Sequence, residues 1–169
     1  MDMNSDLDWN PPHSHDPNPL PPTADTTVFL FTRDQVIPLT LEELQQMPQR
    51  AVPDCYIVST GHGTSGPFSF AGVPLVEIIN VYANSPIEFV DVMSADEFRT
   101  RLRADELSWP TERPIILALS VGGRHLTRLE GLVRLIVPQE NDDALKQVKW
   151  VREIRLLEKG GAQTTSSRL

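Results

Sequence analysis

The chain contains 169 residues, of which 40% are hydrophobic, and its formal net charge is −8 at pH 7. This length predicts one folded domain with a substantial core. The acidic balance argues against nucleic acid as a partner, because neutralising phosphates needs clustered Lys and Arg. The single cysteine, Cys55, excludes an intramolecular disulfide and a zinc site built from several cysteines.

The sequence gives no sign of a membrane span or an export signal. No apolar run reaches the roughly 18 residues that a membrane helix needs. The first six residues, Met-Asp-Met-Asn-Ser-Asp, lack the basic and apolar regions of a signal peptide. We therefore expect a soluble, cytoplasmic protein that does not bind membranes.

Composition divides the chain into three parts. Residues 1–26 contain six Pro and five Asp and no Lys or Arg, which predicts a disordered tail. Residues 27–159 are expected to form the folded domain, and residues 160–169 a flexible C-terminal tail. Within the first tail, His13-Ser14-His15-Asp16 is either a weak metal site or part of a solvated linker.

Local patterns predict the first elements of the domain. Val28–Phe31 is apolar throughout and is predicted to form a buried strand. The segment Thr40–Glu43 has the spacing of a capping box, and it predicts a short helix that ends near Met47-Pro48. The β-propensity of residues 55–59 predicts another strand.

The second half of the domain is predicted to contain one helix and four strands. Pro74 suits the first turn of a helix over residues 76–82, and Gly122-Gly123 suits a tight turn. Apolar runs and period-two alternation predict strands over residues 87–92, 114–119, 134–138 and 148–156. Many strands, few short helices and no regular βαβ alternation predict an α+β fold with mixed β-sheets.

Residues 94–103 fit two patterns. Ser94 and Glu97 have the spacing of a capping box, which favours a helix. Residues 98–103 alternate strictly between arginine and other side chains, which favours a strand. We choose the strand, which places three arginines on one face: Arg99, Arg101 and Arg103. That face is either a solvated sheet surface or a stripe that binds an anion or a protein partner.

A glycine-rich segment, residues 61–66, follows the strand at 55–59. Its Gly-x-Gly-x-x-Gly spacing matches the dinucleotide-binding fingerprint, but that fingerprint needs a helix that starts within the glycines. Here Pro67–Phe70 continues as extended chain, so an anion nest or a turn between strands fits better. Nearby residue types also suggest a hydrolase triad, without showing that the side chains meet: Ser59, His62, Ser65 and Asp96.

Six segments in order along the chain resemble the oxidoreductase molybdopterin-binding domain, the fold of sulfite oxidase. They are residues 40–48, 68–75, 94–96, 117–123, 131–138 and 148–154. The second reads Phe-Ser-Phe-Ala-Gly-Val-Pro-Leu, similar to the family's aromatic-x-Gly-Val-Pro-Leu segment. The last reads Val-Lys-Trp-Val-Arg-Glu-Ile, similar to its Val-Lys-Trp-x-x-x-Ile. The resemblance implies the fold, molybdopterin as cofactor and a redox activity of the sulfite oxidase type.

In that family a cysteine thiolate binds molybdenum, and the spacing to Gly72 places Ser59 at this position. A serine hydroxyl is a hard, weakly acidic ligand that does not replace a soft thiolate. Cys55 lies about 13 Å further back along an extended strand. The resemblance implies cofactor contacts from six residues: Ser59, Gly61, His62, Gly63, Lys146 and Lys149. The two lysines match basic positions near the cofactor phosphate.

Residues 139–143 carry three carboxylates where cofactor-binding members have a glycine-rich loop. These charges would repel an anionic pterin phosphate. We therefore predict a stand-alone domain without a competent molybdenum centre and with no bound cofactor. It would act as a binding or interaction module for a protein partner or a small anionic ligand. The alternative is a molybdenum-dependent oxidoreductase with Ser59 or Cys55 as the metal ligand; no catalytic residue follows from the sequence.

Overall fold

The computed structural model of the protein describes residues 21–59, 63–108, 111–138 and 146–160. Most of the predicted N-terminal tail, the predicted C-terminal tail and the His13–Asp16 segment therefore lie outside the described residues. Two residues of the predicted N-terminal tail, Pro21 and Thr23, accept hydrogen bonds from the Arg128 guanidinium.

A five-stranded sheet has the strand order β2-β1-β11-β5-β6. Its strands are β1 (Val28–Phe31), β2 (Val36–Leu39), β5 (Ile87–Ser94), β6 (Arg99–Arg103) and β11 (Val151–Glu158). The strands β1 and β11 are parallel, and the other neighbours are antiparallel. The sheet is mixed, as the sequence predicts.

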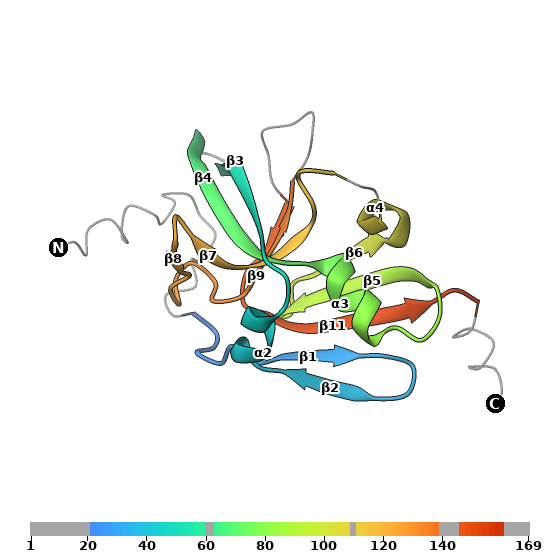
Figure 1. Ribbon diagram of the computed structural model, residues 1–169. Coiled ribbons are helices and arrows are strands. Elements are labelled where there is room, and N and C mark those ends of the chain that lie inside the picture. Colours follow the sequence, from blue (N-terminus) through green and yellow to red (C-terminus); the bar gives the residue numbers. More distant parts are fainter. Residues whose placement is uncertain (1–20, 60–62, 109–110, 139–145, 161–169) are drawn as a thin grey trace.

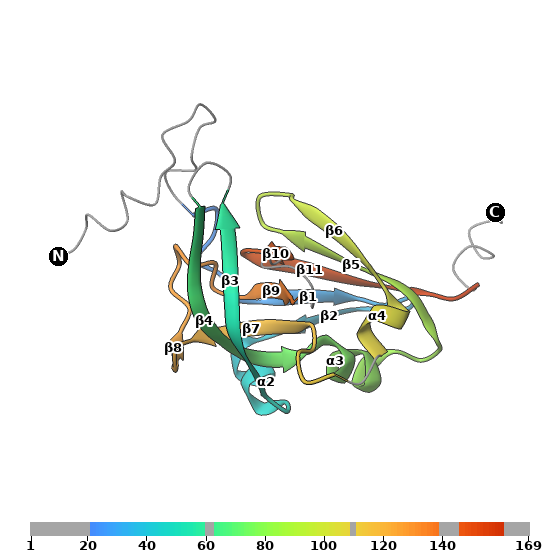
Figure 2. The same ribbon diagram turned by 90° about the horizontal axis from the view of Figure 1, so that it is seen from above.

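A six-stranded sheet has the order β10-β9-β7-β4-β3, with β8 paired to β7. Its strands are β3 (Arg50–Ser59), β4 (Gly63–Pro74), β7 (Ile116–Val121), β8 (Arg124–His125), β9 (Arg134–Val137) and β10 (Lys146–Val148). All its neighbours are antiparallel. Figures 1 and 2 show β3 and β4 as a long two-stranded arm that projects from the rest of the molecule.

Three short helices complete the described fold: α2 (Leu41–Gln46), α3 (Leu75–Tyr82) and α4 (Ala104–Ser108). The predicted capping box of α2 is confirmed, because Thr40 and Glu43 exchange side-chain-to-backbone hydrogen bonds. The predicted helix after Pro74 is present as α3, and Pro74 is its N-cap and not part of its first turn. None of the described helices is long and apolar enough to cross a membrane.

The main hydrophobic core joins both sheets and all three helices, with buried members such as Val90, Leu117 and Ile78. A second, smaller cluster lies on the opposite face of the six-stranded sheet. Successive residues of a strand point to opposite faces, so Leu117 enters the main core and Ala118 enters the second cluster. The second cluster also contains Cys55 and Phe70.

The structure resolves the ambiguous segment at 94–103 and corrects one prediction. Residues 99–103 form strand β6, and the Ser94 hydroxyl bonds the Asp96 carboxylate rather than capping a helix. The predicted final strand over residues 148–156 is wrong as a single element. The chain breaks at Lys149-Trp150, where Trp150 has a φ of 52°. The residues before the break join the six-stranded sheet, and those after it join the five-stranded sheet.

Candidate functional site

Arg134 is a charged residue within a strand that is otherwise apolar. All four residues of β9, Arg-Leu-Ile-Val, are buried, and Arg134 is only 4% exposed. Its Nη1 donates a 3.1 Å hydrogen bond to the Glu130 carbonyl oxygen, and its Nη2 donates to Gln147 Oε1. Its Cζ lies 5.3 Å from the centre of the Phe70 ring. The guanidinium is therefore fixed within the protein rather than extended into water.

The charge of Arg134 is not neutralised by an ion pair in the described part of the chain. Its Nε is buried and has no hydrogen-bond partner there. Burial disfavours the charged form and lowers the pKa of Arg134 to about 10. A buried cation with an open donor is costly for a fold, which makes this position a candidate for binding an anion.

Lys149 places a second cation beside Arg134. Burial, followed by repulsion from Arg134, lowers the pKa of Lys149 to about 8. The Lys149 Nζ also lies 5.7 Å from the centre of the Trp150 ring. Two neighbouring cations favour a bound anion, because the anion would offset the burial cost of Arg134 and the repulsion that Lys149 experiences from it.

The break between β10 and β11 holds Lys149 in place. The Trp150 N–H donates to the Gly131 carbonyl oxygen at 2.9 Å, and the Trp150 indole N–H donates to the Arg128 carbonyl oxygen at 2.7 Å. Gly131 has a φ of +110°, and a Cβ there would lie 2.9 Å from the Lys149 Cβ. Only glycine combines this backbone conformation with so close an approach.

Glu130 is an acidic residue that interacts with both cations, but its carboxylate is paired with another arginine. Its two oxygens accept hydrogen bonds of 2.8 and 2.7 Å from the Arg124 guanidinium. The Thr127 N–H donates to it at 2.8 Å. Arg124 is the main cause that lowers the pKa of Glu130 to about 2. Glu130 thus remains charged at neutral pH while its carboxylate pairs with Arg124 instead of Arg134.

Cys55, the only thiol of the chain, is sealed in the second cluster. It is 0% exposed and its Sγ lies 3.3 Å from the Val52 carbonyl oxygen. The nearest cation, the Arg113 guanidinium, has Nη2 at 3.9 Å. Burial raises the pKa of the Cys55 thiol. A thiol that resists ionisation and touches apolar neighbours is a poor metal ligand.

The predicted cofactor contacts are divided between the two edges of the six-stranded sheet. Ser59 ends β3 and pairs with Gly63, which begins β4, whereas Lys146 begins β10 at the other edge. Gly61 and His62 lie outside the described residues. The structure brings Lys149 beside Arg134, and β9, β7 and β4 separate Lys146 from the β3 edge.

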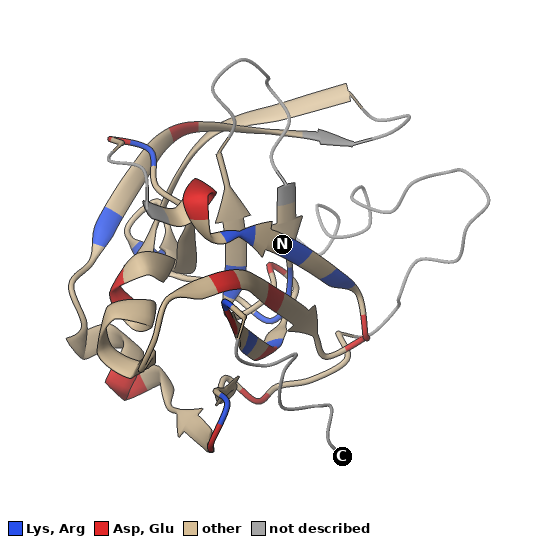
Figure 3. Cartoon of the chain, turned by 90° about the vertical axis from the view of Figure 1, so that its right-hand side faces the viewer, with Lys and Arg blue, Asp and Glu red and all other residues tan. Residues whose placement is uncertain are grey.

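The other chemical motifs of the sequence are not assembled in the described residues. Ser65 lies on β4, whereas Asp96 lies in the turn before β6 of the other sheet. Residues 63–74 form a strand and not the helix that a dinucleotide fingerprint requires. No group of three His, Cys, Asp or Glu side chains among the described residues could hold a metal ion. Figure 3 shows basic and acidic positions interspersed along the described ribbon.

Sequence reasoning missed Arg134 and Glu130. A charged residue at the start of the apolar run Arg-Leu-Ile-Val was the available signal. It is a weak signal, because an arginine at a strand end is usually solvated. Only the fold reveals that Gln147, Phe70 and the Gly131 turn enclose it.

Comparisons with known proteins agree with this fold. The family model of the oxidoreductase molybdopterin binding domain matches residues 28–164, and the chain therefore belongs to this family. Among solved structures, the chain is similar to the sulfane dehydrogenase SoxCD from Paracoccus pantotrophus, with a TM-score of 0.61 and 16% sequence identity. The match covers 79% of this chain and 38% of that chain, and at this identity it supports the fold alone. No curated protein matches the sequence.

The residues present fit one end of a molybdopterin cofactor and not the other. The Arg134 Nε, which has no partner among the described residues, and the partly buried Lys149 suit a phosphate group. The metal end would need a thiolate, and the single cysteine is enclosed among apolar side chains.

Proposed function

We propose that this protein is a binding module of the molybdopterin-binding family that holds a small phosphate-bearing anion and carries no competent molybdenum centre. The observation that carries the proposal is the buried Arg134 guanidinium, which has no ion pair and no hydrogen-bond partner for its Nε among the described residues. Natural folds satisfy nearly all buried polar groups, so the exception supports a ligand that the fold is built to receive.

The chemistry of the site supports a phosphate monoester or inorganic phosphate. Arg134 offers the directed N–H group and Lys149 the point charge, a combination that suits tetrahedral oxyanions. The low-lying pKa of Lys149 implies that binding weakens at alkaline pH, because deprotonation removes one of the two charges. Between the pKa of Lys149, about 8, and that of Arg134, about 10, Arg134 keeps its charge and alone supports the remaining phosphate affinity.

The absence of an accessible thiol supports the second half of the proposal. Molybdenum in this family is ligated by a cysteine, and Ser59 stands at the position that spacing assigns to it. A register shift that brought Cys55 forward would have to extract it from contact with Val52 and Phe70. Family membership is the observation that favours the alternative, a molybdenum-dependent oxidoreductase of the sulfite oxidase type.

Elemental analysis separates the two functions. Untagged protein would be purified from a host that makes the pterin cofactor, and molybdenum per chain would be measured by ICP mass spectrometry. Inorganic phosphate would then be titrated into wild-type protein and into the variant Arg134→Met by calorimetry. The exposed Arg155, which stacks 4.0 Å from the Phe31 ring centre, provides the matched control Arg155→Met.

We expect molybdenum far below one atom per chain, saturable phosphate binding by wild-type and Arg155→Met protein, and none by Arg134→Met. Near-stoichiometric molybdenum would contradict the proposal and favour the molybdenum-dependent oxidoreductase. In that case the metal content of Ser59→Ala and Cys55→Ala would identify the ligand. Equal phosphate affinity in all three proteins would refute the anion site.

A further inference from the structure

We propose that the open edge of β6 is a docking site for an extended acidic segment of a protein partner. The segment would add to the five-stranded sheet as a strand beside β6, a known mode of peptide recognition. This site is separate from the Arg134–Lys149 site, and the two proposals are tested independently of one another.

The strand β6 is the terminal strand of its sheet in the described structure. The Arg103 N–H donates a 3.2 Å hydrogen bond to Glu106 Oε1 and not to the neighbouring strand β5. In an antiparallel pair, alternate residues direct their backbone groups to the same side. The backbone N–H and C=O of Arg101 therefore also face the open edge, where an added strand would pair with them.

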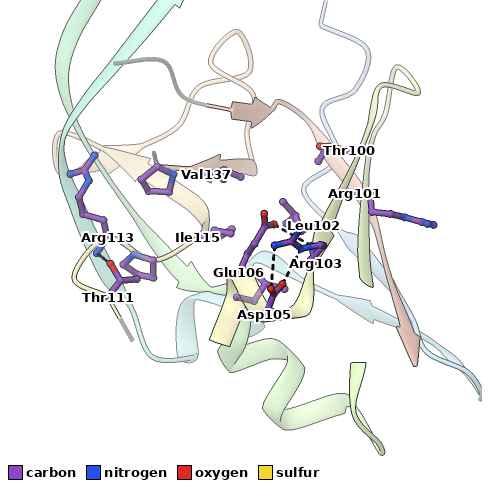
Figure 4. A pocket seen from close by; sticks show the side chains of 13 residues that line it. Thr100, Arg101, Leu102, Arg103, Asp105, Glu106, Thr111, Arg113, Ile115 and Val137 are labelled. Atoms are coloured by element: carbon purple, nitrogen blue, oxygen red, sulfur yellow. Dashed lines mark hydrogen bonds and ion pairs between the residues drawn. The ribbon is translucent and has the colours of Figure 1, made fainter. Parts of the chain in front are cut away.

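A cavity of about 390 Å³ follows this edge. Four consecutive residues of β6, Thr100–Arg103, line it together with α4, Thr111, residues 113–115 and the end of β9. Successive side chains of a strand point to opposite faces. Figure 4 shows the Arg101 side chain directed away from the cavity that it lines. The cavity is therefore next to the backbone of the strand, as docking of another strand requires.

The inner wall of the cavity is apolar. Leu102 of β6 and Val137 of β9 are 3% and 8% exposed, and Ile115 packs against the same core. Figure 4 shows these three side chains around the cavity. Inward-facing residues of a docked strand would contact them, so apolar residues are expected at those positions.

The outer face of β6 is basic. Arg101 and Arg103 are 54% and 63% exposed, and each is paired side-on to a carboxylate, Asp91 and Asp105 respectively. Both pairs use Nε and Nη2, which leaves Nη1 of each guanidinium available among the described contacts. Arg99 is exposed and forms no ion pair within the described residues.

The apolar inner wall of the cavity and the basic outer face of β6 together define the sequence pattern of the partner segment. Carboxylates at every second residue would lie beside Arg99, Arg101 and Arg103, and apolar residues between them would face Leu102 and Val137. Asp105 and Glu106 line the cavity at the Arg103 end, Asp91 pairs with Arg101, and Asp96 and Glu97 precede Arg99 in the chain. Arg99 is therefore the cation of the three that has no ion pair within the described residues. The competing explanation is that arginines on an edge strand prevent unwanted pairing.

Three synthetic heptapeptides test the proposal. The first alternates Glu and Val, the second alternates Lys and Val, and the third is the Glu-Val peptide N-methylated on the edge that would pair with β6. Each would be titrated into the full chain by calorimetry and by amide chemical shifts. The variant Arg99→Glu reverses the key charge, and Arg152→Glu makes the same change at an exposed arginine of the central strand β11.

We expect the Glu-Val peptide to bind at least tenfold more tightly than the other two and to shift the amides of β6. Arg99→Glu should lose at least tenfold in affinity for it, and Arg152→Glu should not. Equal affinity for all three peptides, no saturable binding, or no effect of Arg99→Glu would overturn the proposal. A concentration-dependent dimer that the Glu-Val peptide does not dissociate would overturn it in favour of a second copy.

Discussion

Arg134 and Cys55 lie on the same sheet near Phe70, and both are almost fully buried, at 4% and 0% exposure. Their burial differs in kind. The Cys55 thiol behaves as a small apolar group among apolar neighbours, so packing alone explains it. Arg134 is a buried charge whose Nε has no hydrogen-bond partner in the part of the chain that the structure describes, and an apolar residue of similar size would make the strand more stable. The fold thus retains an unfavourable cation where a ligand would offset it, and encloses its only thiol.

The largest effect is expected at the glycine that holds Lys149 beside Arg134. Gly131→Ala should lower the free energy of unfolding by about 3 kcal/mol, since it combines a left-handed φ with a clash against the Lys149 stem. Gly123 also has a positive φ but has open space around it, so Gly123→Ala should cost only about 1 kcal/mol. Denaturant unfolding measures both. Equal costs would mean that the site does not depend on this close approach.

Arg134→Met should raise the free energy of unfolding by about 2 kcal/mol in the absence of ligand, because it removes a buried charge that has no ion pair among the described residues. The matched change Arg155→Met, on an exposed side chain, should alter the free energy of unfolding by less than about 0.5 kcal/mol. Urea unfolding without phosphate in the buffer decides the sign. A destabilised Arg134→Met protein would show that its contacts with Gln147 and Phe70 outweigh the burial cost.

Lys149 should make stability depend on alkaline pH. Its folded pKa of about 8 lies below the ordinary value of 10.5, so the unfolded state binds the proton more tightly. The free-energy cost of this partly buried charge is then fully present below pH 8 and disappears as the pH rises towards 10.5. The free energy of unfolding of Lys149→Met should exceed that of wild type by about 1.5 kcal/mol at pH 7. This difference should disappear at high pH. A gap independent of pH would exclude titration of Lys149 as its cause.

The smallest effect is expected at the cysteine. Cys55→Ala should lower the free energy of unfolding by about 1 kcal/mol, because it leaves a cavity. It should not change the affinity for phosphate. Because burial raises the pKa of its thiol, native Cys55 should also react far more slowly with a thiol reagent than the unfolded chain does. Rapid labelling of the native protein would show that the thiol is accessible and would reopen its role as a metal ligand.

Much of the fold follows from local patterns in the sequence. The capping box of Thr40 and Glu43, the apolar run Val28–Phe31 and the turn at Gly122-Gly123 appear in the structure as predicted. Each depends on neighbours within a few residues, which is where sequence patterns are informative. The prediction of one strand over residues 148–156 is wrong because apolar residues recur along the whole stretch and give no sign of a break. The break at Trp150 is imposed by contacts with Gly131 and Arg128.

The candidate site was only partly predictable for the same reason. Lys149 could be identified by resemblance, but the burial of Arg134 depends on Phe70 and Gln147 from other strands. Register between those strands is not encoded in any short pattern. Likewise, the sequence around Cys55 does not show whether its thiol faces a cofactor or the apolar cluster in which it lies.

The most direct test of the account is the thermal unfolding of wild-type and Arg134→Met protein, each measured with and without inorganic phosphate at pH 7. A ligand that binds only the folded state raises the melting temperature with its concentration. We predict that phosphate raises the melting temperature of wild type and not that of Arg134→Met, which should melt higher than wild type when phosphate is absent. A phosphate response of equal size in both proteins would contradict the claim that the buried Arg134 is an anion-binding group.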